Sequence, residues 1–247
     1  AGEFIQKPIS IFDSVEIAKA INTLDLPPAK LDIGKLTYEY QLEEKQYNNA
    51  TAFVADKLKD ARKNVSIKPK DVVLYGFGRI GRLVARELMT KAGIGNQLRL
   101  RAIVTRGKIN ATVLEKRASL LRNDSVHGDF HGTVTIDTDN SALIINGTTV
   151  KIISANAPED IDYTQYDIND ALVIDNTGAF RDKEALSRLL NSKGADKVLL
   201  TAPGKGIPNI VHGVNHTEHN PDQVDIFSAA SCTTNAITPI LKAIEDS

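Results

Sequence analysis

The sequence has little cysteine, no long apolar run and no excess of charge of either sign. A single cysteine in 247 residues excludes a disulfide within the chain and permits a reducing compartment. No run of roughly 18 apolar residues is present, so no transmembrane helix is expected. The 30 basic residues are balanced by 31 acidic ones, which argues against a general nucleic-acid binder.

The N-terminus also lacks two common features. It has no methionine, and Ala1-Gly2-Glu3-Phe4 is interpreted as a cloning remnant (residues 1–4). It has no basic segment followed by an apolar one, as a signal peptide would. We therefore expect a cytoplasmic protein without a membrane partner, and we expect no metal site. Internal repeats and low-complexity tracts are absent as well, and the composition is that of an ordinary globular protein.

Residues 5–66 read as a helical N-terminal extension. Asp13 and Glu16 have the spacing of a capping box, and apolar residues follow at helical intervals up to the proline pair at 27–28. A second helix is expected to start near Asn49. No chemistry is evident in this segment.

Beyond the extension, short apolar strands alternate with helices. Strands are expected at 71–75, 98–104, 132–136, 142–146, 149–154, 171–175, 197–201 and 225–229. Helices are expected at 80–92, 111–121, 182–191 and 236–245. The alternation predicts an α/β fold for residues 67–231, a Rossmann-type doubly wound and mostly parallel sheet. Asp-Asn and Asn-Gly between the middle strands indicate hairpins.

A glycine-rich loop lies between the first predicted strand and the first predicted helix of this region. It reads Gly76-x-Gly78-x-x-Gly81, the spacing of a dinucleotide-binding loop. Gly76 would make the tight turn, Gly78 would let the backbone approach a pyrophosphate, and Gly81 would let the helix pack closely. The helix N-terminus would then offer its free N–H groups to phosphate.

The end of the second strand is the position that normally distinguishes NAD from NADP. An acidic side chain there binds the 2′-hydroxyl of the adenosine ribose, but this strand ends with Thr105 and Arg106. Two interpretations stay open. Arg106 either pairs with the 2′-phosphate of NADP or is a solvated residue of a turn.

The single cysteine, Cys232, lies where an apolar strand leads into a helix. A lone cysteine is most often a buried and inert side chain. A thiol at a helix N-terminus, however, has its thiolate stabilised by the helix dipole, and the free N–H groups can hold an oxyanion. Ser231 and Thr233 add hydroxyl donors suited to an anionic substrate.

Six segments together resemble the glyceraldehyde-3-phosphate dehydrogenase family. They are GFGRIGR (76–82), DSVHGDFHG (124–132), NTGAF (176–180), TAPGKG (201–206), GVNH (213–216) and ASCTTN (230–235). They follow the order of that family and extend over roughly residues 70 to 247.

The resemblance implies a set of cofactor-binding residues besides the glycines. Arg79 and Ile80 would contact the cofactor beside the glycine loop. Thr177 and Gly178 would lie along the adenosine–pyrophosphate path, and Thr201 would lie near the nicotinamide. The cofactor is expected to be NAD or NADP.

The resemblance also implies the catalytic chemistry. Cys232 would attack the aldehyde, and phosphate would cleave the thioester formed after hydride transfer. Ser231 and Thr233 would bind a phosphate of the substrate or the attacking phosphate. His127 and His216 match loop positions of the family rather than its catalytic base, and we favour structural roles for both.

Several positions depart from the family pattern. Tyr75 precedes the first glycine in place of the usual Asn, and Val104-Thr105 replaces the usual Asn-Asp after the second strand. Asn176 and Thr201 replace Ser. These departures favour dual cofactor use, or a modest NADP preference, over strict NAD dependence.

The family resemblance also implies a second, catalytic domain, of which residues 232–247 would be the first helix. That domain supplies the family's histidine base and the contacts of a homotetramer. We therefore expect an N-terminal part of a glycolytic, phosphorylating dehydrogenase, inactive alone. Erythrose-4-phosphate dehydrogenase and a non-catalytic dinucleotide-binding module remain alternatives.

Overall fold

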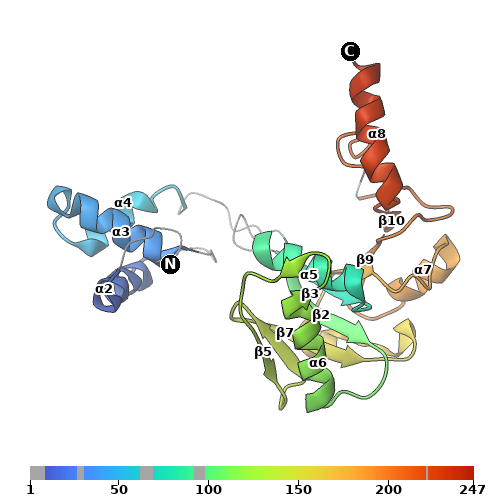
Figure 1. Ribbon diagram of the computed structural model, residues 1–247, viewed down its shortest axis with the longest axis horizontal. Coiled ribbons are helices and arrows are strands. Elements are labelled where there is room, and N and C mark those ends of the chain that lie inside the picture. Colours follow the sequence, from blue (N-terminus) through green and yellow to red (C-terminus); the bar gives the residue numbers. More distant parts are fainter. Residues whose placement is uncertain (1–8, 27–30, 62–68, 92–97, 221) are drawn as a thin grey trace. The chain divides into compact units, whose positions relative to one another are not determined.

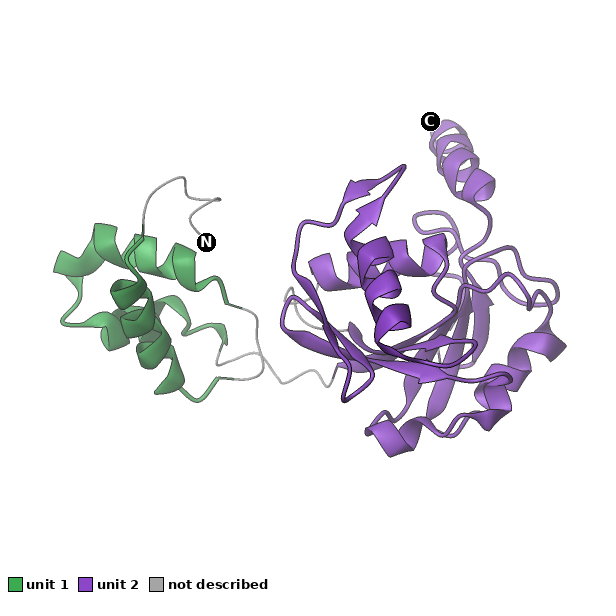
Figure 2. Cartoon of the chain, turned by 60° about the horizontal axis from the view of Figure 1, so that its bottom comes forward, with its two compact units in different colours: residues 1–68, 92–97 green, residues 69–91, 98–247 purple. Residues whose placement is uncertain are grey.

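The computed structural model describes residues 9–26, 31–61, 69–91, 98–220 and 222–247. These residues form two compact units, one from the described residues up to 61 and one from those after 68 (Figure 2). The cloning remnant at 1–4 and the proline pair at 27–28 lie outside the described residues. Among the helices that are described, none is both long and apolar enough to cross a membrane.

The first unit is a small helical cluster. Its elements are α2 (Ile11–Asn22), α3 (Ile33–Glu43), the 3₁₀ turn η1 (Glu44–Gln46) and α4 (Ala50–Lys57). They enclose a core of Ile17, Ala20, Leu36, Ala50, Phe53 and Val54. The predicted start of a helix near Asn49 is confirmed, because the Asn49 side chain caps α4 by accepting a hydrogen bond from Ala52 N at 2.9 Å. The helix α3 was not predicted.

The predicted capping box at the start of the first helix is wrong. The residue that caps α2 is Ser10, which has an extended backbone and accepts a hydrogen bond from Phe12 N at 3.2 Å. Asp13 therefore lies inside the first helical turn, where its charge faces the positive end of the helix dipole instead of capping it.

The second unit is built on one large sheet. Its strands are β1 (Lys70–Tyr75), β2 (Leu98–Thr105), β5 (Val134–Asp137), β6 (Ala142–Ile145), β7 (Thr148–Ser154), β8 (Ala171–Asp175), β9 (Ala195–Leu200) and β10 (Ile226–Ser228). Their spatial order is β10-β9-β8-β1-β2-β7-β6-β5 (Figure 1). Pairs from β10 to β7 are parallel, whereas β6 and β5 are joined by antiparallel hairpins. The predicted Rossmann-type fold is confirmed, and a separate small pair joins β3 (Asn123–Asp124) to β4 (Gly128–Asp129).

Helices cover both faces of this sheet, as the buried strands require. On one face, Val72 and Leu74 of β1 pack with residues of α5 (Arg79–Lys91) and α6 (Ala111–Arg122). On the other face, Val73 and Tyr75 pack with residues of α7 (Lys183–Leu190) and of the 3₁₀ turn η4 (Tyr163–Tyr166). A second 3₁₀ turn, η3 (Pro158–Asp160), contacts α7. The strand order reverses between β1 and β8, because β2 lies on one side of β1 and β8 on the other. Ligands of such sheets bind at this reversal, beyond the carboxyl ends of the strands.

The last helix, α8 (Cys232–Glu245), begins earlier than predicted. It starts at Cys232 rather than at Ala236, because Ser231 caps it by accepting a hydrogen bond from Thr234 N at 2.9 Å. None of its residues is buried. Cys232 is therefore the first residue of the helix.

Candidate functional site

The three glycines of the motif after β1 occur at their positions for different structural reasons. Gly76 has a φ of +94°, and a Cβ there would lie 2.8 Å from Thr177 Cγ2. A Cβ on Gly81 would lie 2.4 Å from the Gly76 carbonyl oxygen. Gly78 differs, because nothing lies within 4 Å of where its Cβ would be. The fold itself therefore requires the first and third glycines, while the second leaves open space in front of the backbone.

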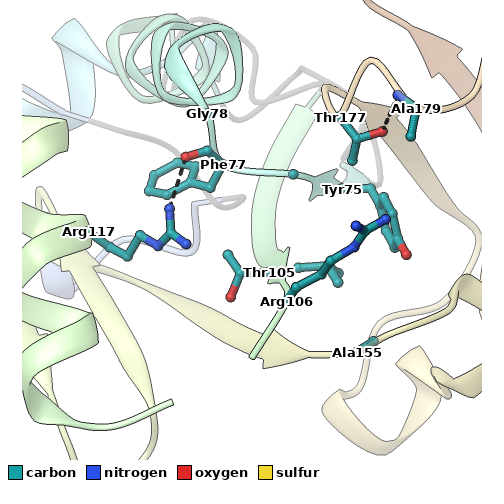
Figure 3. Close-up of a pocket in the computed structure, with 11 residues that line it drawn as sticks. Tyr75, Phe77, Gly78, Thr105, Arg106, Arg117, Ala155, Thr177 and Ala179 are labelled. Carbon is teal, nitrogen blue, oxygen red and sulfur yellow. Dashed lines mark hydrogen bonds between the residues drawn. The ribbon is translucent and has the colours of Figure 1, made fainter. Parts of the chain in front are cut away.

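That open space belongs to a cavity of about 290 Å³ at the carboxyl ends of β1 and β2. Its lining residues are Tyr75, Gly76, Phe77, Gly78, Val104, Thr105, Arg106, Arg117, Ala155, Thr177 and Ala179 (Figure 3). The structure thus brings together five of the predicted cofactor residues: Gly76, Gly78, Thr105, Arg106 and Thr177. The other predicted residues lie outside its lining: Arg79, Ile80, Gly81, Gly178 and Thr201.

The end of β2 forms one wall of the cavity. Thr105 is buried, and its carbonyl accepts a hydrogen bond from Ala155 N at 3.1 Å, which ties β2 to the end of β7. Arg106 is exposed and lines the same cavity. None of the described lining residues is acidic. This wall therefore carries no carboxylate that would repel a phosphate.

A buried carboxyl at the end of β8 positions the opposite wall. Asp175 Oδ1 accepts hydrogen bonds from Thr177 N at 3.1 Å and Thr177 Oγ1 at 2.7 Å, while Oδ2 has no partner among the described residues. Burial raises the pKa of Asp175, and the bonds from Thr177 oppose that shift. Thr201 Oγ1 donates to the carbonyl of Asp175 at 2.9 Å. Sequence reasoning missed Asp175, although an acid that closes a buried apolar strand is a readable signal.

The first residues of α5 are connected to a neighbouring loop rather than to the cavity. Arg79 Nε lies 3.4 Å from Asp124 Oδ2, whereas Ile80 is 50% exposed. His127 Nδ1 lies 3.0 Å from Asp124 Oδ1. Hydrogen bonds from the side chain and backbone of His127 hold the pKa of Asp124 well below its usual range. The Arg79 side chain and His127 thus stabilise the loop that follows α6.

The thiol lies at the start of α8. Cys232 is exposed, so the interpretation of a buried thiol is wrong. Its Sγ lies 4.0 Å from Thr233 Oγ1. Ser231 caps the helix and its Oγ lies 2.6 Å from Thr234 Oγ1. Ala230, just before, adopts the left-handed region with φ 59°, which is unfavourable for a residue with a side chain.

The thiol and the glycine loop share one edge of the sheet, although they do not line one cavity. β10 leads into Cys232 and β1 leads into Gly76, and both strands run in the same direction. β10 is the third strand from β1 in the sheet order. At roughly 4.8 Å between neighbouring strands, the two strands lie about 14 Å apart. Within the described part of the chain, no histidine is hydrogen-bonded to the thiol, and His216 Nδ1 instead accepts from Gly213 N at 3.0 Å.

Comparisons with known proteins agree with this geometry. Residues 70–183 match the family described as "Glyceraldehyde 3-phosphate dehydrogenase, NAD binding domain". A "Glyceraldehyde-3-phosphate dehydrogenase-like protein" of Pseudomonas aeruginosa is 51% identical over 246 residues, covering 96% of this chain and 52% of the relative. The "Glyceraldehyde-3-phosphate dehydrogenase" of Ogataea parapolymorpha is 36% identical, covering 71% of this chain and 48% of the relative.

A plant relative matches over a similar part of the chain. "Glyceraldehyde-3-phosphate dehydrogenase A, chloroplastic" of Zea mays is 41% identical, covering 70% of this chain and 41% of the relative. The chain spans about half the length of these relatives or less. The Pseudomonas match, at 96% of the chain, includes most of the helical unit. Through residues 70–183, the NAD-binding domain, the chain belongs to the glyceraldehyde-3-phosphate dehydrogenase family.

Proposed function

We propose that this chain is the cofactor-binding part of a phosphorylating aldehyde dehydrogenase that acts on glyceraldehyde 3-phosphate with NAD or NADP. The observation that carries the proposal is the placement of an exposed Cys232 at a helix N-terminus, beyond the same sheet edge as the glycine loop. Such an arrangement lets a dinucleotide bound across the carboxyl ends of the strands approach the thiol. Small phosphorylated aldehydes are the substrate class that this arrangement would take.

The residues around the cavity support the binding of a dinucleotide along this edge of the sheet. Gly78 leaves space at the backbone where a pyrophosphate would approach, and Thr105 and Arg106 would lie beside the adenosine ribose. Thr177 and Gly178 would line the path of the pyrophosphate, and the remaining proposed contacts come from Arg79, Ile80 and Thr201. Gly76 and Gly81 would act by shaping the loop.

Cofactor choice follows from the end of β2. Thr105 offers one hydroxyl and no charge where a carboxylate would bind the ribose of NAD. The loss of one hydrogen bond to a charged group should weaken NAD by roughly 1.5–3 kcal/mol, and a pair between Arg106 and the 2′-phosphate would add a similar amount for NADP. We therefore propose dual use or a modest preference for NADP.

The proposed chemistry takes place at the thiol. The thiolate of Cys232 attacks the aldehyde carbon, and the N–H groups at the start of α8 hold the resulting oxyanion. The dinucleotide, when bound, supplies the hydride acceptor. Loss of hydride from the carbon of the thiohemiacetal would leave a thioester, and attack by inorganic phosphate would release the Cys232 thiolate and an acyl phosphate. Thr233, whose hydroxyl lies beside the thiol, and Ser231 would bind phosphate, although the hydroxyl of Ser231 also caps the helix.

A further part of the proposal concerns how the chain is divided. Residues 67–231 would form the cofactor domain, and residues 232–247 would be the first helix of the family's catalytic domain. The Cys232 thiol needs a base to take its proton before it attacks, and the described residues place no histidine at the thiol. We therefore expect the 247-residue chain to bind dinucleotide without turning over substrate.

Two measurements on the purified chain test the proposal. Titration with NADH and NADPH, followed by cofactor fluorescence, should show binding of at least one. Glyceraldehyde 3-phosphate should then slow the alkylation of Cys232 by iodoacetamide, as measured by mass spectrometry, and more strongly than erythrose 4-phosphate does. The reverse order would identify the four-carbon aldehyde as substrate. Dinucleotide binding without protection by either aldehyde would instead favour the non-catalytic module.

A further inference from the structure

The cavity beside the glycine loop has a second cationic wall that sequence reasoning did not identify. Arg117 comes from α6, and Arg106 follows β2, yet both line the same cavity. Figure 3 shows Thr105 between them, with the guanidinium of Arg117 toward Phe77 and that of Arg106 on the side of Tyr75. Two arginines in a cavity whose described lining contains no acid give it a net positive charge.

The fold holds Arg117 in this position. Leu114, Ala118 and Leu121 bury one side of α6 against the sheet, which fixes the direction of the residue between them. Arg117 NH1 donates to the Phe77 carbonyl at 3.4 Å, a long hydrogen bond. In the part of the chain that the structure describes, its other N–H groups have no protein partner, so they are free to bind a ligand.

Positive charge around the glycine loop also exceeds the negative charge that compensates it. Arg82, whose side chain is largely buried, has its pKa lowered by burial and further by Arg79, Arg117 and Arg86. Asp124 is the acid that opposes this shift, and its carboxylate is already shared among Arg79, Arg82 and a histidine. Clustered cations in a concave site favour an anionic ligand.

We propose that Arg117 and Arg106 together bind the phosphate on the 2′-oxygen of the adenosine ribose, and that Arg117 is the residue that selects the phosphorylated dinucleotide. This inference rests on the proposed dinucleotide binding and deepens it. The end of β2 is where a Rossmann-type sheet places that ribose. Arg106 would approach its phosphate from β2 and Arg117 from α6, as arginines favour paired contacts with phosphate oxygens.

The test compares two cofactors that differ only in this phosphate. NADPH and NADH are titrated into the 247-residue chain carrying Arg117→Gln, Arg117→Ala or Arg106→Ala, and binding is read from cofactor fluorescence and calorimetry. Arg117→Gln removes the charge but keeps a polar side chain with N–H donors. Lys116→Ala is the matched control, because it removes one positive charge from the neighbouring, exposed position of α6. Circular dichroism confirms that each variant is folded.

We expect both Arg117 variants and Arg106→Ala to weaken NADPH roughly 10- to 100-fold, the effect of losing one charge-assisted hydrogen bond. NADH affinity should change by less than about twofold, and Lys116→Ala should alter neither cofactor. An equal loss of NADH and NADPH would overturn the inference, because Arg117 would then contact the pyrophosphate that both share. Unchanged NADPH binding in Arg117→Gln would overturn it as well.

Failure of the proposed function gives a different result. If the unmodified chain binds neither NADH nor NADPH, the proposed dinucleotide site is wrong and this inference falls with it. If it binds NADH normally but not NADPH, the dinucleotide site stands and only the role of the two arginines is refuted.

Discussion

Replacing each of two glycines in the loop by alanine should separate fold from ligand binding. Gly78→Ala adds a methyl group where nothing lies within 4 Å, and the φ of Gly78 is not in the left-handed region. Gly81→Ala adds the same group 2.4 Å from the Gly76 carbonyl oxygen. The two variants make the same chemical change three residues apart, so each serves as the control for the other.

The magnitudes follow from these surroundings. Alanine at a compatible position stabilises a protein by about 0.4–1 kcal/mol, since the unfolded chain loses freedom. Gly78→Ala should therefore unfold at the same or a higher denaturant concentration. In Gly81→Ala, alanine gains about 1 kcal/mol in helix propensity, but its Cβ would overlap the carbonyl oxygen of Gly76. Overpacking of this kind costs typically 1–3 kcal/mol, so we expect a net loss of stability.

For dinucleotide binding, we expect the larger loss in Gly78→Ala, the variant that should keep its stability. The methyl group of Gly78→Ala would occupy the space where the proposed pyrophosphate approaches, and we expect at least about a tenfold loss of dinucleotide affinity, or about 1.4 kcal/mol. Urea unfolding followed by circular dichroism measures stability, and calorimetric titration of NADPH measures affinity. The reasoning is refuted if Gly78→Ala binds dinucleotide as tightly as the unmodified chain, or if Gly81→Ala is as stable as Gly78→Ala.

Three further predictions concern single side chains. Burial raises the pKa of Asp175, so its charged form destabilises the folded state at neutral pH, and this cost disappears as the pH falls below the ordinary aspartate range near about 4. Asp175→Asn should therefore be more stable than the unmodified chain at neutral pH, and the difference should shrink as the pH falls towards about 4; a difference independent of pH in urea unfolding would contradict this. Ser231→Ala removes the cap of α8 and should destabilise that helix by about 1 kcal/mol. Because α8 has no buried residue, amide exchange should accelerate within its first turns while the global unfolding midpoint stays unchanged; a shift of the midpoint would show that α8 packs on the core. The exposed Cys232 should react with a thiol reagent to completion in the folded chain, and labelling that requires denaturant would show that the thiol is covered.

Much of the fold could be predicted because its signals are local. Within the strand predicted at 71–75, Val72, Val73 and Leu74 form an apolar run that is fully buried, as expected of a central parallel strand. The hairpin turn at Asn146-Gly147 has positive φ at both residues, the conformation that this pair favours. The start of α2 was misplaced because Ser10 and Asp13 both belong to residue types that cap helices, and only the backbone conformation distinguishes them.

The features of the candidate site also fall into those that a local sequence pattern predicts and those that depend on the tertiary structure. The sequence by itself determined the glycine loop, the absence of an acid after β2 and the residue types around Cys232, because each is a contiguous pattern. The tertiary structure decided that Arg117 lines the same cavity as Arg106, that Asp175 holds Thr177, and that the thiol is exposed beyond the same sheet edge as the glycine loop. Those relations join residues far apart in the chain, and only the strand order and the packing of α6 on the sheet bring them together.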